Sequence, residues 1–198
     1  MGRARTQPRC ARCRMLDAQC LCAALPFVPS RARVVLVPHA REWRQPSNTG
    51  RVALLSLRSA ELAVWGRREA PLDLSLLLRD GHTHLVLHPG PDARPIAPVD
   101  GPVRLLVPDG SWRRAGRIAR RLLALPGAIP VKVDVAPRAG LRRAPEPGKV
   151  HTAAAIAQAL EALGDTAAAA AVRAAGDLMI RRTLEARGRA VSARSSRP

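Results

Sequence analysis

The feature that most restricts the fold of this chain is an alternation between short apolar runs and segments with helical spacing. The apolar runs are rich in Val and Leu, which is typical of strands buried in a sheet. The segments between them place apolar residues three or four positions apart, which indicates helices. Because strands that alternate with helices favour parallel pairing, we predict an α/β fold with a mainly parallel sheet flanked by helices. The expected strands are residues 32–37, 61–65, 84–88, 103–107 and 129–135, and the expected helices are 51–58, 72–79, 112–125, 152–163 and 166–185.

The chain divides into three parts by composition. Residues 1–28 contain all the cysteines and several arginines, and we predict a small module there. Residues 29–185 form the expected α/β domain, although a Pro- and Arg-rich loop interrupts it at 137–148. Only 2% of the residues are aromatic, so the core of this domain must consist of Leu, Val, Ile and Ala. Residues 186–198 are polar and basic, and we expect a disordered tail.

The charge balance indicates a polyanionic partner. The chain has 33 Lys and Arg residues against 15 Asp and Glu, which gives a formal net charge of +18. Nucleic acid is the first candidate for a partner and an anionic membrane surface is the second. We expect neither a membrane anchor nor a secretory signal, because no apolar run is long enough, and we therefore expect a cytoplasmic location. The sequence has no glycine-rich nucleotide-binding loop of either common type.

The four cysteines, Cys10, Cys13, Cys20 and Cys22, form the pattern C-x2-C-x6-C-x-C. Four thiolates are the ligand set of a closed tetrahedral zinc site, so we predict a structural Zn²⁺ here. Two disulfide bonds are one alternative, which a cytoplasmic chain would not keep, and four unrelated small core residues are another.

A second group of polar residues follows the first expected strand, at positions 39–51. Asn48 or Thr49 can cap the next helix, which would leave backbone N–H groups free to receive a phosphate or a carboxylate. The alternative is a capped turn with an ion pair between Glu42 and Arg44 on the surface.

A third group, residues 107–114, runs from a strand end through a tight turn into a helix. Ligands of open α/β sheets bind at such strand ends, and Asp109 lies there. The following helix has no acidic residue and carries several arginines on one side, which would give a positive stripe beside a carboxylate. The alternative is that Asp109 forms a local turn, Ser111 caps the helix and the arginines are simply solvated.

Taken in order, these motifs resemble the DTW-domain family. The resemblance covers roughly residues 8–163, and the joint order of the motifs is far more specific than any one of them. It implies a tRNA-uridine aminocarboxypropyltransferase, which uses S-adenosylmethionine, and a fold related to the knotted SPOUT methyltransferases. The matching residues are Cys10, Cys13, Cys20 and Cys22; His39, Glu42 and Asn48-Thr49-Gly50-Arg51; His88-Pro89-Gly90; and Asp109-Gly110-Ser111-Trp112.

The resemblance also suggests roles for individual residues. Asp109 is the first candidate for the base that removes the proton from uridine N3, and Glu42 is the second. The expected contacts to S-adenosylmethionine come from Asn48, Thr49, Gly50, Pro89, Gly90, Gly110, Ser111 and Trp112. The expected contacts to tRNA come from Arg51, Arg113, Arg114, Arg117 and Arg121.

The chain departs from the family pattern at two positions. Ser111 replaces a Thr and keeps its hydroxyl, whereas Ala154 replaces a Glu and removes a carboxylate. Three other readings of the sequence remain open. They are a SPOUT-like RNA methyltransferase, a zinc-knuckle protein that binds nucleic acid without catalysis, and a basic protein of the membrane surface.

Overall fold

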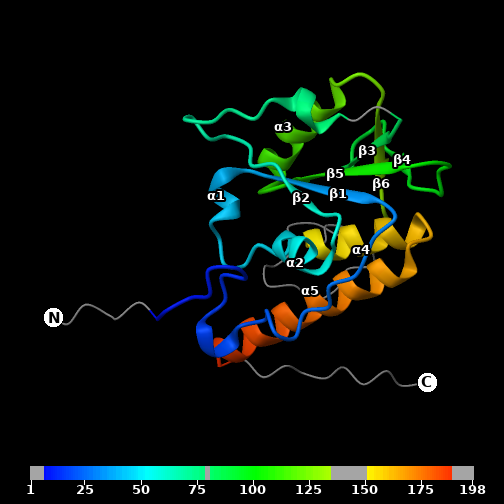
Figure 1. Ribbon diagram of the computed structural model, residues 1–198. Helices are drawn as coiled ribbons and strands as arrows, with labels where there is room; N and C mark the ends of the chain where they lie inside the picture. The colour runs from blue at the N-terminus through cyan, green and yellow to red at the C-terminus, as the bar shows by residue number, and fades with distance from the viewer. Residues whose placement is uncertain (1–6, 79–80, 135–150, 189–198) are drawn as a thin grey trace.

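The computed structural model describes residues 7–78, 81–134 and 151–188 and confirms the predicted α/β fold (Figure 1). Its described part contains a six-stranded sheet with the strand order β2-β1-β5-β3-β6-β4. All neighbouring strands are parallel. The strands are β1 (Arg33–Pro38), β2 (Glu61–Leu62), β3 (Thr83–Leu87), β4 (Arg94–Pro95), β5 (Val103–Asp109) and β6 (Ala128–Lys132).

Helices cover both faces of this sheet. In Figure 1, α3 lies on one face, and α2, α4 and α5 lie on the other. None of the helices in the described ranges is both long and apolar enough to cross a bilayer. The α-helices are α1 (Ala40–Trp43), α2 (Gly50–Ser56), α3 (Trp112–Leu123), α4 (Thr152–Ala162) and α5 (Thr166–Ala186), and two short 3₁₀ helices are η1 (Asp17–Gln19) and η2 (Leu74–Leu77).

The alternation of side chains along the central strands creates two cores. Val34 and Leu36 of β1 pack in the larger core, beneath α2, α4 and α5, whereas Val35 and Val37 pack beneath α3. This is the two-residue period of a strand that is buried on both faces.

The N-terminal segment contributes to the larger core. Cys13, Met15 and Leu21 are buried in that core together with residues of α2, α4 and α5. Arg182 Nη1 donates a hydrogen bond to the carbonyl oxygen of Cys20, and the N-terminal segment lies against the C-terminal end of α5 (Figure 1). The cysteine-containing segment therefore rests directly on the α/β domain.

Some elements differ from their expected extent. The expected helix at 72–79 is only the 3₁₀ helix η2 in its described part, because Asp73 accepts a hydrogen bond from the Ser75 N–H, a local bond that competes with a regular helix. The expected strand at 61–65 forms a ladder only over β2, and Trp65 makes an isolated bridge with His39. The loop at 137–148 and almost all of the tail at 186–198 lie outside the described residues.

Candidate functional site

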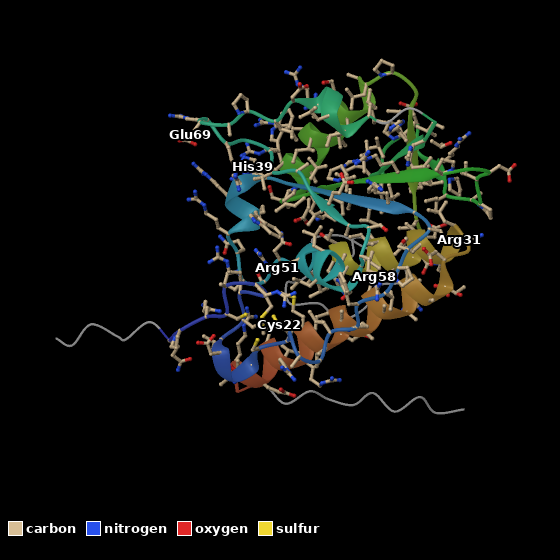
Figure 2. All side chains as sticks on the ribbon, viewed as in Figure 1. Cys22, Arg31, His39, Arg51, Arg58 and Glu69 are labelled. Atoms are coloured by element: carbon tan, nitrogen blue, oxygen red, sulfur yellow. The ribbon has the colours of Figure 1, made fainter. Side chains whose placement is uncertain are left out.

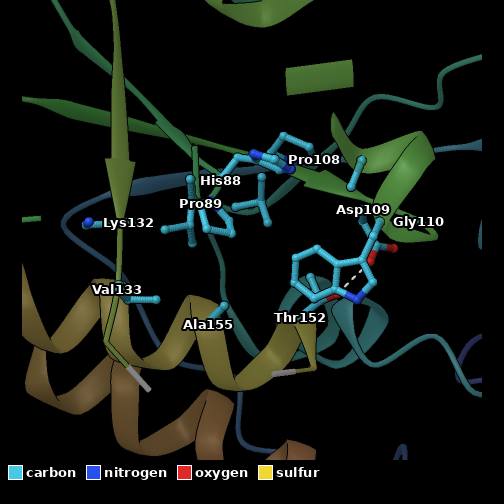
Figure 3. Close-up of a pocket in the computed structure, with 13 residues that line it drawn as sticks. His88, Pro89, Pro108, Asp109, Gly110, Lys132, Val133, Thr152 and Ala155 are labelled. Atoms are coloured by element: carbon cyan, nitrogen blue, oxygen red, sulfur yellow. Dashed lines mark hydrogen bonds between the residues drawn. The ribbon is translucent and has the colours of Figure 1, made fainter. Parts of the chain in front are cut away.

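A pocket lies at the edge of the sheet where the parallel strands end. The ends of β1 and β5 are in register, with Pro38 opposite Asp109, and the His39 N–H donates to the Asp109 carbonyl oxygen at 2.9 Å. The pocket has a volume of about 110 Å³. This is the position where open α/β sheets bind ligands. Its lining comes from the ends of β3, β5 and β6 and from the first turns of α3 and α4: Leu87, His88, Pro89, Val107, Pro108, Asp109, Gly110, Trp112, Ala115, Lys132, Val133, Thr152 and Ala155 (Figure 3).

The carboxylate of Asp109 joins three parts of the chain. Asp109 is only 6% exposed. Its Oδ1 accepts a hydrogen bond from Thr152 Oγ1 at 2.6 Å, drawn in Figure 3, and its Oδ2 accepts one from Asn48 Nδ2 at 2.5 Å. The hydrogen bonds to Thr152 and Asn48 are tertiary, which differs from the local turn that the sequence also allowed.

Residues 48–50 support the pocket from behind. Thr49 is at the N-cap position of α2 but makes no capping bond with its side chain; instead Asn48 Oδ1, one residue earlier, accepts a hydrogen bond from the Arg51 N–H at 3.2 Å. Thr49 Oγ1 accepts one from the Ala153 N–H at 3.4 Å, which connects α2 to α4. A Cβ on Gly50 would lie 2.8 Å from Leu36 Cδ1, so the close packing of α2 on β1 requires glycine. None of these three residues is among those that line the pocket.

Arg51 is buried, although a phosphate contact was expected of it. It is 4% exposed, and its guanidinium stacks on Trp43 with Cζ 3.7 Å from the ring centroid. Arg51 Nη2 also donates to the carbonyl oxygen of Trp43. Burial lowers the pKa of Arg51 to about 10. The structure therefore separates Arg51 from the exposed arginines.

Glu42 lies next to Gly110, the residue that follows β5, and does not line the pocket. Its Oε1 is 3.0 Å from Arg114 Nη1, and the two side chains are 13% and 27% exposed. The ion pair thus joins α1 to α3, and it differs from the surface pair with Arg44 that the sequence allowed as an alternative. A Cβ on Gly110 would lie 3.2 Å from Arg114 Cβ and 3.5 Å from Glu42 Cγ, so glycine leaves room for this pair.

The remaining expected contacts to S-adenosylmethionine divide into two groups. Pro89, Gly110 and Trp112 line the pocket, whereas Gly90 and Ser111 are exposed and do not. Ser111 occupies the N-cap position of α3, but its side chain makes no capping hydrogen bond.

Three pocket residues with polar side chains had been given no role from the sequence: His88, Lys132 and Thr152. Burial lowers the pKa of His88, and its Nε2 is buried with no hydrogen-bond partner in the described part of the chain. His88 directly follows β3, Lys132 ends β6 and Thr152 begins α4. Their position at the end of a strand or the start of a helix is the sequence signal that could have identified them.

Helix α3 presents a positive surface next to the pocket. Its first residues, Trp112 and Ala115, line the pocket, and the helix contains no acidic residue. We call its exposed arginines the α3 arginine face: Arg113, Arg117, Arg120 and Arg121.

The four cysteines come together as predicted, in an arrangement that could hold a metal ion. They are free thiols, and their sulfur atoms all lie within 4.8 Å of one another. The Sγ atoms of Cys10 and Cys22 are 3.7 Å apart, and those of Cys13 and Cys20 are 3.9 Å apart. Tetrahedral zinc with Zn–S bonds of about 2.3 Å requires sulfur separations of about 3.8 Å, so this geometry fits the metal.

The thiols differ in their tendency to ionise. Backbone N–H groups of Cys13 and Arg12 lower the pKa of Cys10 to about 6. Burial raises the pKa of Cys22 to about 12, because the neutral form is favoured away from water. Figure 2 shows the sulfur atoms between the N-terminal segment and the end of α5, beneath Arg51.

These features define a parallel α/β domain with a ligand pocket at the carboxyl edge of its sheet and a cysteine cluster at one side. The sequence model of the DTW domain matches residues 7–184, and the chain belongs to the DTW-domain family. Among solved structures, the chain is similar to the SAM-dependent rRNA:acp-transferase Tsr3 from Vulcanisaeta distributa. The two chains are 19% identical, with a TM-score of 0.47, and the match covers 79% of this chain and 84% of the other.

Proposed function

We propose that this protein transfers the 3-amino-3-carboxypropyl group from S-adenosylmethionine to N3 of a uridine in tRNA. Membership of the DTW-domain family supports an aminocarboxypropyl transferase that acts on RNA. The observation that carries the proposal is the pocket shared by Asp109, Trp112 and Thr152, which adjoins the α3 arginine face. An apolar wall, a carboxylate and a positive surface are the three features that this reaction needs.

The reaction is a displacement at carbon. Uridine N3 loses its proton and attacks the carbon of the aminocarboxypropyl arm that is bonded to sulfur. The N–C bond forms as the C–S bond breaks, and 5′-methylthioadenosine leaves with the bonding electron pair. The enzyme selects this product by orientation, because the same sulfonium also offers a methyl group.

Asp109 is the residue that we propose as the base for uridine N3. Asp109 lies at the pocket wall, whereas Glu42 does not line the pocket and is paired with Arg114. Its bonds from Asn48 and Thr152 fix the carboxylate in one orientation at the pocket wall. Asp109 therefore removes the N3 proton, and Glu42 holds Arg114.

The pocket wall provides contacts for the adenosine part of S-adenosylmethionine. Pro89 and Trp112 supply apolar surface, and Gly110 contributes to the same wall. His88 also lines the pocket. Asn48, Thr49 and Gly50 act indirectly, because they hold the carboxylate and α4 in place.

Recognition of tRNA rests on the α3 arginine face. Because α3 also lines the pocket, phosphates bound along it would bring a nearby nucleotide to Asp109. The chain has few aromatic side chains for base stacking, so recognition depends on phosphates and on the shape of the folded RNA.

The cysteine cluster would hold a structural Zn²⁺. Cys10, Cys13, Cys20 and Cys22 supply four ligands and leave no open position for a substrate. Bound zinc would fix the N-terminal segment on α5.

The test is incubation of the zinc-loaded protein with unmodified tRNA and two preparations of S-adenosylmethionine, one labelled in the methyl group and one in the carboxypropyl arm. We expect label from the arm on uridine. Methyl label would replace the proposed reaction with RNA methylation. Absence of both labels together with salt-sensitive tRNA binding would favour a binding protein, or an RNA substrate other than tRNA. The matched variants Asp109→Asn and Glu42→Gln distinguish the two carboxylates.

A further inference from the structure

Arg51 is a buried cation without a carboxylate in direct contact. It is 4% exposed, and no Asp or Glu of the described chain lies within ion-pair distance of it. Its Nε is also buried without a hydrogen-bond partner in the described residues. A buried charge is unfavourable unless an opposite charge lies nearby. The stacking on Trp43 offsets only part of this cost.

The sulfur atoms of the cysteine cluster lie beneath Arg51 in Figure 2, and among the groups that favour the charge of Arg51 the largest effect comes from Cys13. Cys13 stabilises the charged form of Arg51, whereas Arg14 opposes it. The carboxylate of Asp109 acts in the same direction as Cys13, with a smaller effect. Cys13 is buried in the same core as Val52, the residue that follows Arg51 in α2. A divalent metal bound by four thiolates carries a net charge of about −2, so such a centre would supply the negative charge that this buried guanidinium needs.

A chain of hydrogen bonds runs from Arg51 to the pocket. The Arg51 N–H donates to Asn48 Oδ1, and Asn48 Nδ2 donates to Asp109 Oδ2. The first bond fixes which end of the Asn48 amide faces Asp109, because the oxygen is held by α2 and the NH₂ group must point at the carboxylate. A change in the position of Arg51 therefore reaches Asp109 through one intervening side chain.

We propose that Arg51 is a positioning residue that couples the metal centre of the four cysteines to Asp109. The metal holds the guanidinium, the guanidinium holds the start of α2, and Asn48 transmits this position to the carboxylate. The metal thus organises the pocket wall as well as the N-terminal segment. This inference rests on the metal site and on the role of Asp109 in the proposed function, but its test requires no catalysis.

The first measurement is zinc retention by the zinc-loaded protein. Zinc transfer to a chromogenic chelator is followed for the wild type, Arg51→Met, Arg51→Lys and Arg58→Met. Arg58 is the matched control because it lies just beyond α2 but is exposed, with Cζ 5.5 Å from the Phe27 ring. We expect Arg51→Met to lose zinc about tenfold faster than Arg58→Met, the lower end of the effect of removing a partner of metal ligands. Arg51→Lys keeps the charge and should restore much of the retention.

The second measurement is the carboxyl ¹³C signal of Asp109 in zinc-loaded protein labelled at aspartate. The variant Asp109→Asn identifies this signal by its disappearance. We expect the signal to move in Arg51→Met, because loss of the guanidinium shifts the start of α2, whose Arg51 backbone N–H is bonded to Asn48. It should stay unchanged in Arg58→Met, because Arg58 lies beyond the other end of α2. Circular dichroism confirms that the compared variants are folded.

Two results would overturn the inference. One is equal zinc retention by folded Arg51→Met and Arg58→Met, which would remove the link between Arg51 and the metal. The other is an Asp109 signal that does not move in Arg51→Met, which would remove the link between Arg51 and the pocket. A failure of the proposed transfer reaction would appear in the labelling experiment alone and would leave both readouts intact.

Discussion

Replacement of Asp109 by Asn tests the base and the geometry of the pocket together. In the variant, one carboxylate oxygen becomes an NH₂ group. If that group faced Asn48, two donors would meet at the 2.5 Å now occupied by a hydrogen bond, and Asn48 cannot reverse because its oxygen is held by the Arg51 N–H. The new NH₂ group must therefore face Thr152, whose hydroxyl can accept as well as donate. The protein should fold, with the substituted side chain in this single orientation.

The expected loss of stability is calculated from the bonds of Asp109 with Asn48 and Thr152. Both are hydrogen bonds to a charged group, worth about 1.5–3 kcal/mol each, and both become neutral bonds worth about 0.5–1.5 kcal/mol. The expected loss in the free energy of unfolding is about 1–3 kcal/mol, since the neutral amide also costs less to bury. For a chain of this length, each kcal/mol corresponds to a fall in Tm of about 2–4 °C. Loss of the base should lower kcat by about 10²–10⁴-fold.

The assay is arm-label transfer at saturating substrates, with urea unfolding followed by tryptophan fluorescence. Thr152→Val is the matched control, because it removes one bond to Asp109 but keeps the carboxylate. It should lower kcat by less than about tenfold, since it affects only orientation. Full activity of Asp109→Asn would refute the role of Asp109 as the base. An unfolded Asp109→Asn would refute the argument that Thr152 accommodates the amide.

Four further predictions concern stability and RNA binding. Arg104→Met should raise the free energy of unfolding by about 1–3 kcal/mol in urea titrations, because Arg104 is 0% exposed and its Nε and Nη1 have no hydrogen-bond partner among the described residues. The substitution breaks the ion pair of Arg104 with Glu61, but Glu61 is partly exposed and keeps its ion pair with Arg33. A loss of stability would contradict this prediction. Arg14→Gly should stabilise the protein by about 0.5–1 kcal/mol, because Arg14 has a φ of 65°, whereas Arg12→Gly should destabilise it. Burial lowers the pKa of His84 and His88, so the unfolded chain binds more protons than the folded protein below about pH 6.5. The Tm should therefore fall as the pH drops from about 7.5 to about 5.5, and a Tm that increases as the pH drops would contradict this prediction. Binding of tRNA through the α3 arginine face should give a slope of log K against log salt of about −3, and a flat response would count against it.

The sequence predicted the frame of the fold well because the strands are apolar on both faces. The expected strand at residues 103–107 corresponds to β5, and that at 84–88 corresponds to β3. Short elements were missed, since α1 has four residues and β4 has two, which is below what periodicity can detect. The expected helix at 72–79 failed because a local hydrogen bond from the Ser75 N–H to the Asp73 side chain competes with helical pairing.

The candidate site was predicted in pieces. Sequence patterns identified Asp109 and Asn48 in separate motifs, but the bond between them depends on the register that places Pro38 opposite Asp109. The burial of Arg51 could not be predicted, because an arginine after a capping motif is equally compatible with an exposed helix start. The hydrogen bond from Thr152 to Asp109 requires the start of α4 to lie beside the end of β5, and a local sequence pattern does not predict that arrangement.

The two edges of the sheet are its shortest strands, and this has a consequence for the behaviour of the protein in concentrated solution. β2 and β4 have two residues each, whereas the interior strands have five to seven. Pro95 of β4 has no N–H to offer a neighbouring chain, and Arg94 adds a charge at the same edge. Within the described residues, neither edge therefore offers a row of unpaired backbone groups long enough to template another strand. The apolar interior strands are thus protected from joining those of another molecule, and the folded protein should resist aggregation through its sheet.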